Sequence, residues 1–185
     1  MSEKRVLLDR RALHAALDEM AKNVLALNPD VKRLALVGIR TRGINLAERL
    51  KTRLDHLSGC EVPIGALDIT LYRDDLSTLA KQPLLGETRL PFDVEGKEIV
   101  LVDDVLYTGR TVRAALDAIV AYGRPQRIIL AVLVDRGNRE YPIQPDVAAV
   151  KITTDHNQNV SVRFDELDGE EGVALLTKRP EDTHF

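Results

Sequence analysis

Apolar residues recur at alternating spacings of four and three in the segment that follows Asp9. The residues on this stripe are Leu13, Leu17, Met20, Val24 and Leu27. This spacing predicts an amphipathic helix that Asp9 caps and that ends before Asn28 and Pro29. The polar face of the helix carries His14, Asp18, Glu19 and Lys22.

Three short, continuous apolar runs are typical of strands buried on both faces. They cover Leu34 to Ile39, Ile99 to Val102 and Ile128 to Val134. A loop and a helical face follow each of the first two runs, marked by Ala47, Leu50, Leu54 and Leu57, and by Val112, Leu116, Ile119 and Val120. Between them, Ile64 to Leu71 alternates apolar and polar residues, which predicts a further strand. This alternation of strands and helices favours an α/β fold with a mainly parallel central sheet flanked by helices.

The other segments lack a helical period. Residues from Tyr72 to Glu95 show no period at all, which is typical either of a flexible lid or of a passive insertion. Val160 to Phe164 alternates and Val173 to Leu176 is apolar, so both predict antiparallel strands appended to the sheet. We expect a single domain over residues 1–179 and a disordered tail at 180–185.

Composition adds little to this picture. The 185 residues carry a net charge of −3, which gives no overall field for polyanions, although residues 110–139 hold six Arg and residues 165–185 hold seven acidic groups. The single Cys60 excludes an internal disulfide, and we interpret it as a small buried or half-buried residue without a chemical role. The N-terminus lacks the apolar run of a signal peptide, and the longest apolar run is seven residues. We therefore expect a soluble, cytoplasmic protein with no membrane segment.

Polar loops follow three of the predicted strands, at residues 40–43, 103–111 and 135–139. In the middle loop, Gly109 permits close approach of the backbone, while the helix start and the hydroxyls of Thr108 and Thr111 favour a phosphate. Asp103 and Asp104 would repel that phosphate, so they make better acceptors for sugar hydroxyls. The loop therefore predicts a site for ribose 5-phosphate, and the alternative is an ordinary turn in which an Asp or Thr caps the helix. No Walker loop and no G-x-G-x-x-G fingerprint occurs in the sequence.

The segment from Ile99 to Thr111 resembles the 5-phosphoribosyl-1-pyrophosphate (PRPP) signature of type I phosphoribosyltransferases. More narrowly, four motifs resemble the PyrR family of bifunctional uracil phosphoribosyltransferases and pyrimidine-operon regulators. They are V-G-I-R-T-R-G at 37–43, D-I-T-L-Y-R-D-D-L at 68–76, D-D-V-L-Y-T-G-R-T-V-R-A at 103–114 and L-V-D-R-G-N-R-E at 133–140. The likeness runs from about Val6 to Leu176, and it implies the type I fold with a small hood and a lid loop.

The resemblance also implies roles for individual residues. The PRPP and phosphate site would comprise Thr41, Arg42, Asp103, Asp104, Val105, Leu106, Tyr107, Thr108, Gly109, Arg110 and Thr111. Asp103, Asp104, Arg42 and Arg73 would be catalytic, and Tyr72, Arg73, Asp74 and Asp75 would form the lid. Asp135, Arg136 and, more weakly, the backbone near Val160 would line the base pocket. The loop at Thr41 and Arg42 would hold pyrophosphate, often through a cis peptide, and Mg²⁺ would be bound mainly through PRPP rather than by protein ligands.

The implied reaction is the conversion of uracil and PRPP to UMP and pyrophosphate. Purine-salvage relatives usually carry an acid where Tyr107 stands, which favours uracil over purine bases, although a purine-base phosphoribosyltransferase stays an alternative. A homodimer or homotetramer is implied, and so is binding of pyrimidine-leader mRNA, for which Lys22 and Arg139 are the candidate contacts. That surface is weakened by residues that are acidic or uncharged, namely Asp18, Glu19, Asn138, Gln144 and Val150. An enzyme, with or without regulation, and an RNA-binding attenuator that senses nucleotide both stay open.

Overall fold

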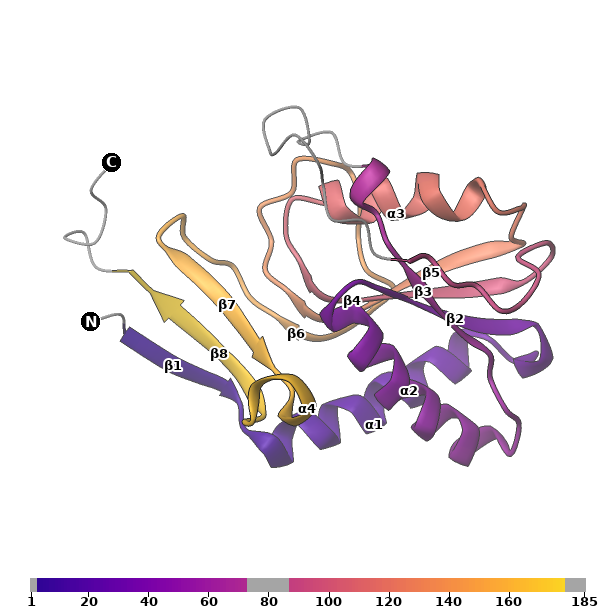
Figure 1. Cartoon of the computed structure of the whole chain (residues 1–185). Helices are drawn as coiled ribbons and strands as arrows, with labels where there is room; N and C mark the ends of the chain where they lie inside the picture. Colours follow the sequence, from indigo (N-terminus) through magenta and orange to yellow (C-terminus); the bar gives the residue numbers. More distant parts are fainter. Residues whose placement is uncertain (1–2, 73–86, 179–185) are drawn as a thin grey trace.

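The computed structural model describes residues 3–72 and 87–178, and it is an α/β structure with two sheets (Figure 1). The larger sheet has five parallel strands in the order β3-β2-β4-β5-β6. Their bounds are β2 Leu34–Ile39, β3 Ile64–Leu67, β4 Glu98–Leu106, β5 Arg127–Asp135 and β6 Val147–Lys151. From β2 the chain moves outward to β3, and from β4 it moves outward in the opposite direction. The strand order therefore reverses between β2 and β4, where open parallel sheets bind their ligands.

Helices cover both faces of this sheet, as its strand sequences require. Helices α1 (Arg10–Leu27) and α2 (Arg42–Ser58) lie on one face, and α3 (Arg110–Val120) lies on the other (Figure 1). In β4, Val100 and Val102 pack with α1 and α2, whereas Ile99 and Leu101 pack with α3. Because successive side chains of a strand point to opposite faces, a continuous apolar run serves both layers. The fold class predicted from the sequence is confirmed.

The second sheet is antiparallel and has the strand order β1-β8-β7. It is formed by β1 (Glu3–Leu8), β7 (Gln158–Arg163) and β8 (Gly172–Thr177), and the short helix α4 (Asp165–Asp168) connects the last two. We call this unit the hood. It stands beside the larger sheet (Figure 1), so the prediction that β7 and β8 are appended to that sheet is wrong. Neither β1 nor β6 was predicted.

Local signals placed the helix boundaries well. The Asp9 carboxylate accepts a hydrogen bond of 2.8 Å from the Ala12 amide, and α1 ends at Leu27. The alternating segment at 64–71 forms a strand only to Leu67, and a 3₁₀ turn covers Thr70–Tyr72. Cys60 is exposed, contrary to expectation. Among the described residues no helix is both long and apolar enough to span a bilayer, and the predicted tail at 180–185 lies outside them.

Candidate active site

The loops that follow β2, β4 and β5 meet at the carboxyl edge of the sheet. The closest approach is at Gly43, the second residue of α2, where a Cβ atom would lie 2.6 Å from the Val102 carbonyl oxygen and 3.3 Å from Cα of Asp103. Only glycine allows the start of α2 to pack so tightly on β4. This contact brings the predicted pyrophosphate loop beside the predicted ribose-binding acids.

The two acids lie within β4 rather than in the loop after it, because the strand continues to Leu106. Asp103 is buried, and its carboxylate accepts a 3.0 Å hydrogen bond from the Asp104 amide; Asp104 in turn accepts one of 3.0 Å from the Val105 amide. Burial, together with the charge of Asp104, raises the pKa of Asp103 well above its usual value. Burial also raises the pKa of Asp104, although Arg42 acts in the opposite direction. Perturbed carboxylates of this kind are typical of functional sites.

The predicted phosphate loop begins α3. Gly109 is the N-cap, in the left-handed conformation with φ of 92°, and it has no side chain with which to cap the helix. The Thr108 hydroxyl accepts a 3.3 Å hydrogen bond from the Arg110 amide. The first amides of a helix otherwise lack partners within it and favour an anion. The start of α3, at residues 108–111, is therefore the candidate phosphate cradle, at the carboxyl end of β4.

The loop after β5 is hydrogen-bonded to this candidate cradle through the backbone. The Thr108 carbonyl accepts hydrogen bonds of 2.8 and 3.0 Å from the amides of Glu140 and Tyr141, and the Leu106 carbonyl accepts one of 3.0 Å from the Arg136 amide. The Arg110 side chain pairs with Glu140 at 2.6 Å. The loops after β4 and β5, which are distant in the sequence, therefore form one hydrogen-bonded unit.

Arg136, a predicted base-pocket residue, has its side chain engaged by other protein groups. It is buried, and its three guanidinium nitrogens donate to the Thr154 hydroxyl, the Asn159 amide oxygen and the Gln158 carbonyl at 2.8–3.0 Å. Its guanidinium also lies 4.0 Å from the ring centroid of Tyr107. Arg136 therefore supports Tyr107, whose ring is partly exposed, rather than offering free donors to a base.

Arg139, a predicted RNA contact, is also turned inward. It donates to the carboxylate of Asp135 at 2.6 Å, to the Tyr107 carbonyl at 2.9 Å and to the Ile143 carbonyl at 2.7 Å. Only 13% of its side chain is exposed, so it stabilises the loop and has little surface for a phosphate. Lys22 is exposed and pairs with Glu19 at 2.5 Å, a hydrogen bond that raises the Lys22 pKa.

A cavity of about 300 Å³ opens beside Asp135. Gly137, Lys151, Ile152 and Thr153 complete its lining. Lys151 ends β6 and the next two residues follow it. The sequence pattern did not reveal this strand, so these residues were missed as candidates for the base pocket. Val160 lies buried in β7, where it pairs with Leu175 of β8.

Thr41 lies between β2 and α2, and Arg42 is the first residue of α2. The cis peptide bond joins Arg40 to Thr41, one residue earlier than expected. Thr41 is exposed, whereas Arg42 points toward the hood and donates to the Val162 carbonyl at 2.9 Å and to Asp168 at 2.7 Å. No sequence signal singles out Asp168, which stands in an acidic run without a motif. Of the predicted lid, Tyr72 ends the 3₁₀ turn, and Arg73, Asp74 and Asp75 lie outside the described residues.

The site combines a phosphate cradle, a pair of acids and a basic loop at the switch point of a parallel sheet, and this combination defines a class. The sequence profile of the phosphoribosyl transferase domain matches residues 6–167, and the chain belongs to that family. Solved hypoxanthine phosphoribosyltransferases share the fold. One from Trypanosoma cruzi matches with a TM-score of 0.73 and 19% identity over 97% of both chains. One from Staphylococcus aureus matches with a TM-score of 0.68 and 20% identity over 96% of this chain and 93% of that one.

Within the class, the chain is most clearly similar to proteins described as bifunctional protein PyrR. The relative from Pelotomaculum thermopropionicum is 53% identical over 174 residues, which are 94% of this chain and 96% of the relative. The relative from Thermus aquaticus is 52% identical over 178 residues, or 96% and 98% of the two chains. The resemblance inferred from the four motifs is confirmed.

Proposed function

We propose that this protein transfers the phosphoribosyl group of PRPP to uracil, which forms UMP and releases pyrophosphate. The single observation that carries the proposal is the packing of Gly43 of α2 on β4, which brings Arg42 beside the acid pair of the strand that leads into the cradle at the start of α3. A 5′-phosphate fits the cradle at residues 108–111, and the ribose hydroxyls have acceptors in Asp103 and Asp104. The similarity to PyrR relatives supports uracil as the base.

The chemistry follows from where charge develops. As the bond from C1 of ribose to pyrophosphate breaks, positive charge grows on the sugar and negative charge grows on the leaving group. Asp103 and Asp104 stabilise the cationic sugar, and Arg42 stabilises the pyrophosphate. The predicted lid, which includes Arg73, would exclude water that could otherwise attack the cation.

A divalent cation fits this arrangement. Among residues 3–72 and 87–178, no three His, Cys, Asp or Glu side chains converge into a metal cage. The oxygens of Asp103 and Asp104 are of the kind that Mg²⁺ prefers, and PRPP would supply the other ligands. When bound, Mg²⁺ neutralises part of the charge on the diphosphate.

A single assay tests the reaction. Release of pyrophosphate from PRPP is followed with uracil, with hypoxanthine and without a base, and we expect rapid release with uracil alone. Asp104→Asn keeps the shape of the side chain but weakens its charge, so turnover should fall at least tenfold, which is about 1.4 kcal/mol. Release with hypoxanthine but not uracil would instead indicate a purine enzyme, and unchanged turnover in the variant would remove Asp104 from the mechanism.

A second function is favoured by the description of the relatives as bifunctional. We propose that the same site binds UMP and thereby regulates binding of pyrimidine-leader mRNA, in an enzyme that assembles as a homodimer or homotetramer. If the chain serves mainly as an attenuator, UMP should strengthen RNA binding while turnover is slow. Parallel measurement of both quantities on one preparation separates the two functions.

A further inference from the structure

Arg42 contacts the hood through two of its three guanidinium nitrogens. Nε donates to the Val162 carbonyl at 2.9 Å, and Nη2 donates to Oδ1 of Asp168 at 2.7 Å. The other carboxylate oxygen of Asp168 accepts a 2.9 Å hydrogen bond from the Phe164 amide. Both oxygens of Asp168 are therefore held, one by the backbone of the hood and one by Arg42, so the carboxylate has a fixed direction.

The same guanidinium also acts on the larger sheet. The next residue, Gly43, packs against Asp103 of β4, so Arg42 stands at the junction of the hood and the acid pair. In agreement with this position, the charge of Arg42 opposes the rise in pKa that burial causes at Asp104. Within the described residues, the hydrogen bonds of the Arg42 guanidinium come from Nε and Nη2 and leave Nη1 without a partner, and 38% of the side chain is exposed. One edge of the guanidinium is thus held by the hood while the other keeps a donor for an anion.

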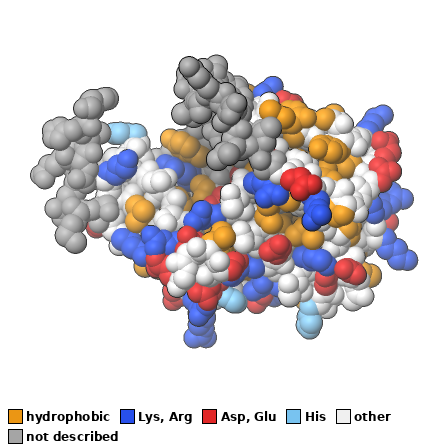
Figure 2. All heavy atoms as spheres, in the orientation of Figure 1, with side chains coloured by type: hydrophobic (Ala, Val, Ile, Leu, Met, Phe, Trp, Pro, Cys, Tyr) orange, Lys and Arg blue, Asp and Glu red, His pale blue; other side chains and the backbone are white. Residues whose placement is uncertain are grey.

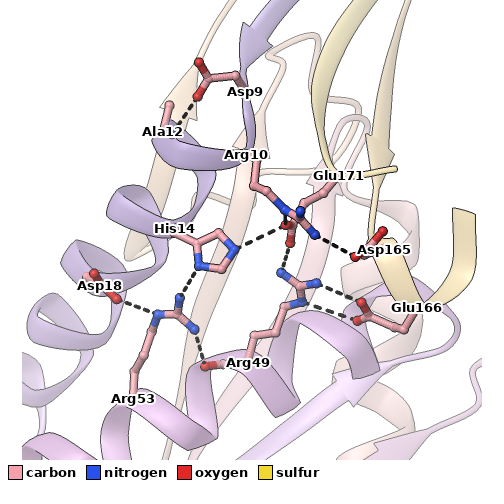
Figure 3. Close-up of polar contacts among 10 residues, drawn as sticks. All are labelled: Asp9, Arg10, Ala12, His14, Asp18, Arg49, Arg53, Asp165, Glu166 and Glu171. Atoms are coloured by element: carbon pink, nitrogen blue, oxygen red, sulfur yellow. Dashed lines mark hydrogen bonds and ion pairs between the residues drawn. The ribbon is translucent and has the colours of Figure 1, made fainter. Parts of the chain in front are cut away.

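The hood has other anchors, which hold α4 in place independently of Arg42. Arg49, two turns further along α2, pairs with Glu166 at 2.7 Å and with Glu171, while Arg10 of α1 pairs with Asp165 at 2.6 Å (Figure 3). Loss of the contact between Arg42 and Asp168 should therefore leave α4 on the surface of α1 and α2. The contact can be tested without dismantling the hood.

We propose that Asp168 is a positioning residue, which orients Arg42 so that its remaining edge faces the diphosphate of PRPP. The inference rests on the proposed function, since it assigns Arg42 to the leaving group. A flexible arginine side chain otherwise loses conformational entropy when the ligand binds. A fixed carboxylate orders the side chain before binding, so less entropy is lost in the binding step. Asp168 would thus act on substrate affinity through Arg42 and would touch no reacting atom.

The test compares Asp168→Asn with Asp165→Asn, a control on the same turn whose partner is the exposed Arg10. For Asp168→Asn we expect the KM for PRPP and the Kd for inorganic pyrophosphate to rise about tenfold, with kcat and the Kd for UMP changed less than twofold. Asp165→Asn should change none of these. In Arg42→Ala the substitution at 168 should have no further effect, because a positioning residue needs the residue that it positions.

The outcomes separate the two proposals. If Arg42→Ala weakens pyrophosphate binding but Asp168→Asn leaves it unchanged or tightens it, the positioning role is wrong and the reaction stands. Equal weakening of UMP and pyrophosphate in Asp168→Asn would indicate a structural role and would also overturn it. Calorimetry with pyrophosphate and UMP needs no turnover. If Asp168→Asn weakens only pyrophosphate binding while the wild-type protein makes no UMP, the positioning role stands and only the proposed reaction is overturned.

Discussion

At the scale of single residues, function and stability oppose each other at Asp103. The side chain is buried beside a second carboxyl, and both features disfavour its charged form. A carboxyl whose pKa is higher in the folded than in the unfolded protein destabilises the fold once the pH exceeds the unfolded value. The acid pair, which the proposed reaction requires, therefore lowers the free energy of unfolding.

Asp103→Asn should accordingly raise the free energy of unfolding at pH 7, by about 1 kcal/mol, while UMP formation falls at least tenfold. The gain should be absent below about pH 4, where both states hold the proton, and should grow as the pH rises through the unfolded and then the folded pKa. Urea unfolding across this range measures it. Asp117→Asn, at a half-exposed carboxylate of α3, is the control and should bring no gain in stability. A less stable Asp103→Asn at pH 7 would contradict the expectation.

At the scale of elements, the junction of α1, α2 and the hood depends on Glu171. Only 3% of its side chain is exposed, and it receives hydrogen bonds from Arg10, His14 and Arg49 (Figure 3). Burial alone would raise its pKa, but these donors lower the pKa to about 2. Three segments far apart in the sequence are thus joined at one carboxylate.

Glu171→Gln should lower the free energy of unfolding at pH 7 by about 1–2 kcal/mol, a range that allows for solvent screening because the partners Arg10 and His14 are more than half exposed. Because the folded pKa is depressed, the stabilisation should be fully present above about pH 4.5 and should be lost as the pH falls toward 2. Thermal unfolding of both proteins between pH 2 and 7 measures the difference. Glu61→Gln is the matched control, because 88% of that side chain is exposed, and an equal effect there would refute a special role for Glu171.

At the scale of the whole molecule, the uneven charges of the sequence cancel in space. The acidic run at 165–171 pairs with Lys4, Arg10, Arg42, Arg49 and Arg163. On the face shown in Figure 2, basic and acidic side chains are interspersed. With Arg139 turned inward, the predicted RNA contacts are few among the described residues.

We therefore expect weak binding of a pyrimidine-leader hairpin, with a micromolar Kd that depends only shallowly on salt. Each phosphate contact contributes about 0.9 to the slope of log affinity against log salt on duplex and less on single strands. Titration of labelled RNA at several salt concentrations measures the slope, and Lys22→Ala should reduce it by at most one contact. Nanomolar binding at physiological salt, strengthened by UMP, would show that a second copy of the chain completes a basic surface.

Sequence alone determined the parts of this protein whose signals are local. The stripe from Leu13 to Leu27 with its Asp9 cap, the buried strands and the acids before Thr108 depend on neighbours within a few residues. Those signals sufficed for the fold class and the family. The motifs predicted a PRPP site, but they did not predict the directions of individual side chains.

Tertiary structure alone decided the features that require partners distant in the chain. Strand β1 is largely charged and exposed, and it forms because β8 offers backbone partners, as in the pairing of Glu3 with Thr177. Arg136 and Arg139 turn inward because carbonyls and side chains of later segments satisfy them. Arg42, at the start of α2, contacts Val162 and Asp168 of the hood, which lie far from it in the sequence. Hydrogen bonds and ion pairs across more than a hundred residues leave no periodicity, so only the folded chain reveals them.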